Sequence, residues 1–166
     1  MEYSLKPAGY SEKAIIENLL QYYFYDFTEF NDAGVNDQGR FDDYPYFENY
    51  WNEEGRFPYL IKVKEENAGF VLVRYDAFED YFSVAEFFIM KKFRRSGLGK
   101  QIAHSVFRMH SGKWEVVQIE KNRPAQSFWR KVIDDYASGI YSERVENGRV
   151  IQTFCSKKRR EHCENI

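Results

Sequence analysis

The chain has 166 residues, of which 43% are hydrophobic and 30% are charged, and its formal net charge is −2. This length suits one domain with a single core, and a net charge near zero argues against a nucleic-acid-binding protein. No apolar run is long enough for a signal peptide or a membrane span, so we expect a cytoplasmic protein with no membrane partner.

Charge is divided unevenly along the chain. Residues 1–80 carry 7 basic and 17 acidic side chains (7 − 17 = −10), whereas residues 81–166 carry 17 and 9 (17 − 9 = +8). The two halves either meet different partners or attract each other, and the sequence leaves both open. Cys155 and Cys163 form neither a CxxC motif nor a metal-ligand pattern, so we expect free thiols and no metal site.

The first half predicts a short strand, an aromatic-rich helical region and a hairpin. Hydrophobic spacing and turn residues place these elements at residues 2–6 (strand), 11 to about 26 or 30 (helix), 46–52 (short helix), and 56–64 and 68–75 (strands).

The second half begins with an apolar central strand that we expect to be covered on both faces. A helix at 98–109 and a strand at 114–119 follow, and a strand reached through a crossover should lie parallel to the central one. Further elements are predicted at 84–90 (central strand), from 124 (helix), and at 140–145 and 149–154 (a hairpin around Asn147-Gly148). We divide the chain into one domain at 1–156 and a tail at 157–166.

A cationic turn with two glycines, Lys91 to Lys100, joins the central strand to its helix. Glycines let the backbone approach a ligand, and the first amides of a helix favour an anion such as a phosphate. The Walker A and dinucleotide-binding patterns both fail here, because the required glycines are missing. The segment Arg94-Arg95-Ser96-Gly97-Leu98-Gly99 instead fits [QR]-x-x-G-x-[GA] and resembles the pyrophosphate turn of the GNAT-type N-acetyltransferase superfamily.

A second motif supports this resemblance. Asn122, Ala125, Phe128 and Trp129 match the family's strand–Asn–x–x–Ala–x–x–aromatic–aromatic segment at the expected separation. The resemblance covers roughly residues 57–155. It implies an α/β fold with a central mixed sheet of about seven strands and helices on both faces, and it implies acetyl-CoA as the cofactor.

The resemblance also implies which residues bind acetyl-CoA. Backbone amides of the turn would bind the pyrophosphate, the end of the central strand would pair with the pantetheine, and the second motif would pack beside it. The implied cofactor-binding residues are Phe88, Ile89, Met90, Arg94, Arg95, Ser96, Gly97, Leu98, Gly99, Lys100, Asn122, Phe128 and Trp129.

Acetyl transfer to an amine also requires a base, because an alkyl ammonium has a pKa of about 10.4. Glu86 is the candidate, as the only carboxylate in the apolar central strand and on the same strand face as Phe88. Many relatives have a tyrosine acid where this chain has Trp129, whose indole is no acid in the working pH range. Tyr136 is the nearest replacement in sequence.

The predicted function is therefore transfer of an acetyl group to a primary amine of a small molecule or peptide. We expect a preference for basic acceptors, because residues 22–30 and 42–51 combine carboxylates with aromatic faces. Two alternatives stay open: a catalytically silent acyl-CoA-binding module, and a nucleic-acid-binding domain that uses the basic half. A homodimer is also left open.

Overall fold

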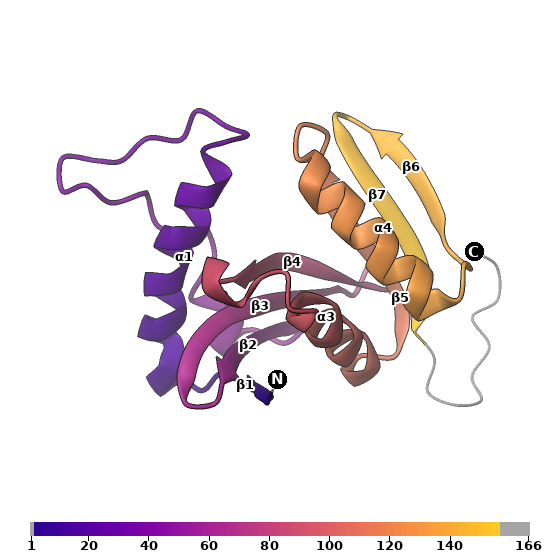
Figure 1. Cartoon of the computed structure of the whole chain (residues 1–166), viewed down its shortest axis with the longest axis horizontal. Coiled ribbons are helices and arrows are strands. Elements are labelled where there is room, and N and C mark those ends of the chain that lie inside the picture. Colours follow the sequence, from indigo (N-terminus) through magenta and orange to yellow (C-terminus); the bar gives the residue numbers. More distant parts are fainter. Residues whose placement is uncertain (1, 157–166) are drawn as a thin grey trace.

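The computed structural model describes residues 2–156, so the predicted tail at 157–166 lies outside the described residues. Seven strands form one sheet in the order β1-β2-β3-β4-β5-β7-β6. The expected α/β fold, a mixed sheet of about seven strands with helices on both faces, is confirmed (Figure 1). The elements are β1 (Tyr3–Pro7), the 3₁₀ turn η1 (Tyr10–Glu12), α1 (Lys13–Phe27), α2 (Asn49–Asn52), β2 (Arg56–Val63), β3 (Glu66–Asp76), β4 (Tyr81–Ile89), the 3₁₀ turn η2 (Lys91–Phe93), α3 (Leu98–Met109), β5 (Gly112–Ile119), α4 (Arg123–Ala137), β6 (Ser142–Glu146) and β7 (Arg149–Ser156).

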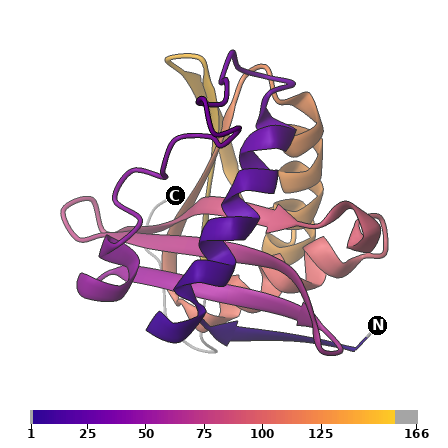
Figure 2. The same cartoon turned by 90° about the vertical axis from the view of Figure 1, so that its left-hand side faces the viewer.

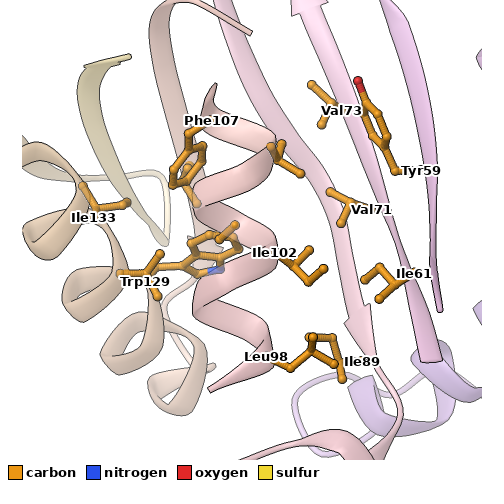
Figure 3. Packing of buried hydrophobic residues seen from close by; sticks show 14 of the residues in the cluster. Tyr59, Ile61, Val71, Val73, Ile89, Leu98, Ile102, Phe107, Trp129 and Ile133 are labelled. Atoms are coloured by element: carbon orange, nitrogen blue, oxygen red, sulfur yellow. The ribbon is translucent and has the colours of Figure 1, made fainter. Parts of the chain in front are cut away.

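Helices cover the two faces of this sheet separately. Figure 2 shows α1 lying across strands β2 to β4, and α3 and α4 lie behind the sheet in that view. The core is therefore divided into two hydrophobic clusters. One contains Phe70, Leu72 and Phe88 beneath α1, and the other contains Ile89, Ile102, Phe107 and Trp129 beneath α3 and α4. Figure 3 shows the second cluster, in which residues of α3 fill the space between β3 and α4.

The β6–β7 hairpin forms around the predicted turn. Asn147 and Gly148 both have a positive φ, 50° and 72°, as a type I′ turn requires. The β2–β3 hairpin is likewise as expected, with antiparallel register from Arg56 opposite Arg74 to Val63 opposite Glu66.

Strands β4 and β5 diverge. They are parallel, as the sequence predicts, but only two register pairs join them, Phe82 with Trp114 and Ser83 with Glu115. Beyond Ser83, the β5-facing edge of β4 therefore runs on without a strand partner. This gap in the sheet positions the candidate site.

Three sequence expectations need correction. The short helix begins at Asn49 and not at residue 46, because Tyr46 has a positive φ of 60° and cannot continue a right-handed helix. The central strand begins earlier, at Tyr81, because that residue pairs with Asp76 across the β3–β4 hairpin. Cys155 is disulfide-bonded, so the expected free thiol is wrong for this residue, while Cys163 lies outside the described residues.

Candidate active site

The β4–α3 turn forms from local backbone preferences. Residues Lys91–Phe93 make a 3₁₀ turn, and Gly97 then caps α3 in the left-handed region at φ 84°. A Cβ at Gly97 would meet only Gln101 Nε2, at 3.9 Å, so the glycine is required for its φ and not for lack of space. No side chain caps α3, and the first amides of a helix lack partners within that helix.

Gly99 serves a different purpose. A Cβ there would lie 3.1 Å and 3.2 Å from two ring atoms of Phe128 and 3.6 Å from Cδ1 of Ile89. Its missing side chain therefore allows α3 to pack against α4 and β4. The second glycine of the motif is explained by packing within the protein.

Most of the cations around this turn have carboxylate partners. Arg94 and Lys91 both pair with Asp26 of α1, Lys92 pairs with Glu66, and Lys100 lies 2.8 Å from Asp135 of α4. Arg95, at φ 59°, is exposed and has no ion pair within residues 2–156. Three of these pairs join the acidic first half to the basic second half, which supports mutual attraction as one cause of the charge division.

The free edge of β4 is centred on Phe87 and Ile89. Met90 N–H donates to Ala68 O of β3 at 2.8 Å, and Phe88 pairs in register with Phe70. Because residues of an antiparallel strand alternate in direction, the backbone groups of Phe87 and Ile89 point away from β3, toward the gap. The carbonyl of Ile89 accepts from Arg94 Nε at 2.6 Å. The groups left for a ligand are the N–H of Ile89 and both backbone groups of Phe87.

The second motif lies beside this edge. Asn122 caps α4 by accepting a hydrogen bond from Ala125 N–H at 3.0 Å, which leaves its amide nitrogen free of the cap. Trp129 packs edge-on against Phe87 with ring centroids 5.2 Å apart, and Phe128 contacts Phe87 at 5.8 Å. The second motif therefore lies at the gap between β4 and β5, and it meets the turn where Phe128 packs against Gly99.

A cavity of about 580 Å³ opens at this gap. Its volume falls within the usual range for small-molecule sites. Three residues from the sequence-predicted set line it: Glu86, Asn122 and Trp129. The remaining lining comes mainly from α1, β3, β4, β5, β7 and their flanking loops, and includes Tyr23, Phe24, Phe27, Asn31, Arg74, Tyr81, Ser83, Phe87, Gln118 and Arg149.

Glu86 is held by tyrosines from the α1 side. Its carboxylate accepts a hydrogen bond from Tyr23 Oη. Burial raises the pKa of Glu86 above its usual value, and hydrogen bonds from Tyr23 and Tyr44 partly oppose this rise. A carboxylate with a raised pKa at the wall of a cavity is suited to accept a proton.

Tyr136 lies apart from this cavity. Its hydroxyl is 2.7 Å from Ser156 Oγ, and its ring packs against Phe107 and His104 beneath α3. It is not among the lining residues, so the structure does not bring it together with Glu86.

Several residues that line the cavity lie outside the motifs recognised in the sequence. Arg74 is a charged residue in the apolar strand β3, the same signal that singled out Glu86 in β4. The segments expected to bring carboxylates to the acceptor contribute only aromatic side chains, Tyr23, Phe24 and Phe27. Among the described residues that line the cavity, Glu86 is the single carboxylate, so the lining does not support the expected preference for basic acceptors.

Comparison with known proteins decides the family. The family model of the acetyltransferase (GNAT) family matches residues 16–133. The chain belongs to the GNAT acetyltransferase family. No curated protein sequence matches.

Solved structures of this family share the fold at low sequence identity. A GNAT-family acetyltransferase from Listeria monocytogenes is 13% identical with a TM-score of 0.67, over 93% of this chain and 95% of that one. The ribosomal-protein-S18-alanine N-acetyltransferase of Escherichia coli is 9% identical with a TM-score of 0.65, over 99% of each chain. The PaiA N-acetyltransferase of Thermoplasma acidophilum, solved with coenzyme A, is 9% identical with a TM-score of 0.64, over 93% of this chain and 99% of that one.

The protein is thus an acetyl-CoA-dependent N-acetyltransferase, as the sequence predicts. The structure fits this cofactor at two places. The uncapped N-terminus of α3 suits a pyrophosphate, and the unpaired edge of β4 suits an extended, amide-containing chain. No helix within residues 2–156 is long and apolar enough to cross a membrane.

Proposed function

We propose that this enzyme acetylates a primary amine of a small molecule or peptide that binds in the cavity between β4 and β5, with Glu86 as the base. The observation that carries the proposal is the position of Glu86. Its side chain lines the same cavity as Phe87, whose backbone groups lie on the free edge of β4. A base and the donor edge therefore meet in one cavity.

Acetyl-CoA supplies an acetyl group already activated as a thioester, so positioning provides much of the acceleration. We infer that the backbone amides of Leu98, Gly99 and Lys100 bind its pyrophosphate. Arg95, two residues before Gly97, adds positive charge beside them. The edge at Phe87 and Ile89 would pair with the pantetheine, and the Asn122 amide would donate to it. Arg94 orders the turn through its hydrogen bond to Ile89 O, so we assign it a positioning role.

Removal of the proton from the amine, which we assign to Glu86, is more demanding than protonation of the leaving thiolate. An alkyl ammonium has a pKa of about 10.4, so removing its proton near neutral pH costs about 4 kcal/mol at 1.36 kcal/mol per unit. The raised pKa of Glu86 makes it a stronger base than a solvated carboxylate. Tyr23 orients the carboxylate toward the cavity through its hydrogen bond.

The thiol that leaves needs less assistance. A thiol has a pKa of about 8.5, so its thiolate is only modestly unstable near neutral pH. Trp129 lines the cavity with an indole N–H that donates hydrogen bonds without giving up a proton. We assign no acid role to Tyr136, because its hydroxyl is bonded to Ser156.

The test measures binding and turnover separately. Acetyl-CoA and CoA should raise the melting temperature of the protein with a saturable dependence on concentration. Release of CoA thiol with an amine acceptor then distinguishes an enzyme from a silent acyl-CoA-binding module. Binding without thiol release across a broad amine screen would contradict the proposed function. Light scattering of the same samples would decide whether the protein is a homodimer.

A further inference from the structure

The cavity holds more positive than negative charge. Arg74 of β3 and Arg149 at the start of β7 line it, opposite the single carboxylate of Glu86. Glu86 is already hydrogen-bonded by Tyr23. Neither arginine has an ion pair or hydrogen bond to any side chain in the part of the chain that the structure describes. The described part of the protein therefore leaves the positive charge of both arginines in the cavity without an anionic partner.

Arg74 is the more informative of the two. Its Nε is buried without a hydrogen-bond partner. Its register partners are Ser83 of β4 and another cation, Arg56 of β2. Arg56 has a partner of its own in Glu53, 3.6 Å away. A buried donor without an acceptor is costly, and like charges on opposed strand positions repel each other. No residue within 2–156 supplies an anion for Arg74, so an anionic ligand is the partner that this side chain needs.

This arginine cannot serve the cofactor's pyrophosphate. Arg74 pairs with Ser83 near the beginning of β4, whereas the α3 N-terminus follows the end of β4 at Ile89. Six residues of strand at about 3.3 Å each separate Ser83 from Ile89 by about 20 Å. The missing anion therefore belongs to the acceptor side of the cavity.

Arg74 does lie near the proposed base. Glu86 is opposite Leu72, and Arg74 lies two residues farther along β3, so both side chains share the α1 face of the sheet. Two residues span about 7 Å along a strand. One small molecule can place an amine at Glu86 and an anionic group at Arg74.

We propose that the acceptor is an amine that also carries an anionic oxygen group, a carboxylate or a phosphate, which Arg74 binds and Arg149 supports from the rim. This inference rests on the proposed function and specifies its substrate class. A planar guanidinium with several donors suits two-point binding of such oxygens. The partly buried position of Arg74 strengthens the interaction relative to an exposed pair.

The experiment compares acceptors that carry the anionic group with neutral partners of the same carbon skeleton. Amino acids are compared with their amides, and O-phosphoethanolamine with ethanolamine, in binding to the CoA-saturated protein and in release of CoA thiol. The wild type should bind and acetylate the anionic acceptor of at least one pair, the carboxylate or the phosphate, better than the neutral acceptor of that pair. Arg74→Gln should raise KM for that member about 10- to 100-fold with little change in kcat, and leave its neutral partner unaffected.

Two control variants sharpen the result. Arg74→Lys should retain part of the preference, and Arg108→Gln, on the exposed side of α3, should retain all of it. A wild type that binds no anionic member, or an Arg74→Gln variant that loses both members of a pair equally, would overturn the inference. Binding of an anionic member without any transfer would support this inference and contradict the proposed function.

Discussion

The β4–α3 turn and the cavity between β4 and β5 both contain arginines, but the two regions treat their charges differently. At the turn, Arg94 and Lys91 share Asp26, and Lys100 has Asp135. In the cavity, Arg74 has no carboxylate partner among residues 2–156. A basic motif in the sequence therefore does not by itself mean that its cations are free to bind a ligand. At the turn, the groups left to bind a ligand are the backbone amides, whereas in the cavity it is the guanidinium of Arg74.

The largest expected effect tests the base in the cavity. Glu86→Gln should lower kcat/KM for the amine by about 100-fold or more, with acetyl-CoA affinity nearly unchanged, because general-base catalysis typically contributes about 10²–10⁴. Rates measured from pH 6 to 9.5 should show the deficit shrinking as free amine accumulates. A deficit independent of pH would assign the proton transfer to another group.

The same substitution has a predictable effect on stability. Burial raises the folded-state pKa of Glu86, so the folded protein holds this proton more tightly than the unfolded chain. This difference stabilises the folded protein fully at pH values below the pKa of Glu86 in the unfolded chain. The stabilisation is lost as pH rises through the pKa of Glu86 in the folded protein. Glu86→Gln should therefore have a higher melting temperature than the wild type at pH 8, and the advantage should decrease toward pH 4. An equal difference at both pH values would contradict the burial of this carboxylate.

The two glycines of the turn separate ligand binding from packing. Gly97→Asp should abolish acetyl-CoA binding, because it strains a left-handed residue and places a negative charge beside the pyrophosphate. Gly99→Ala should destabilise the fold by about 1–3 kcal/mol, because its Cβ meets the Phe128 ring at 3.1 Å. Calorimetry with CoA and thermal unfolding measure the two effects. A Gly99→Ala protein as stable as the wild type would show that the Phe128 ring can move aside without loss of stability.

A smaller effect is expected from the tyrosine beside the base. Tyr23→Phe removes a hydrogen bond that favours the ionised form of Glu86, so the pKa of Glu86 should rise further. The acid limb of the kcat/KM profile should move to higher pH, with a loss of about 2- to 10-fold at pH 6.5 that disappears by pH 9. A uniform loss across pH would indicate damaged packing, since Tyr23 also contacts Phe88 with ring centroids 6.2 Å apart.

The smallest effect concerns the paired charges of the turn. Asp26→Asn frees Arg94 and Lys91, so CoA affinity should rise about 2- to 5-fold at low salt, and the gain should vanish near 0.5 M salt. Stability should change by less than about 1 kcal/mol, as for other exposed ion pairs. A large loss of CoA affinity would instead show that Asp26 positions Arg94 for binding.

The elements that carry the two motifs could be predicted because their signals are local. The α3 helix has the predicted bounds, and the turn meets the second motif where Gly99 packs against Phe128. One exception is instructive. Phe88 and Met90 were expected to face the pantetheine, but the alternation of strand β4 directs them to β3, and Phe87 faces the gap.

The elements and the family could be predicted from the sequence, because hydrophobic period, turn residues and short motifs act over a few neighbouring residues. The cavity between β4 and β5 could not be predicted in this way. Its lining joins Tyr23 of α1, Arg74 of β3, Glu86 of β4 and Arg149 of β7, which the chain separates by dozens of positions. Whether a charge is paired there depends on strand register and a β-bulge between Leu72 and Val73, and no local pattern encodes either.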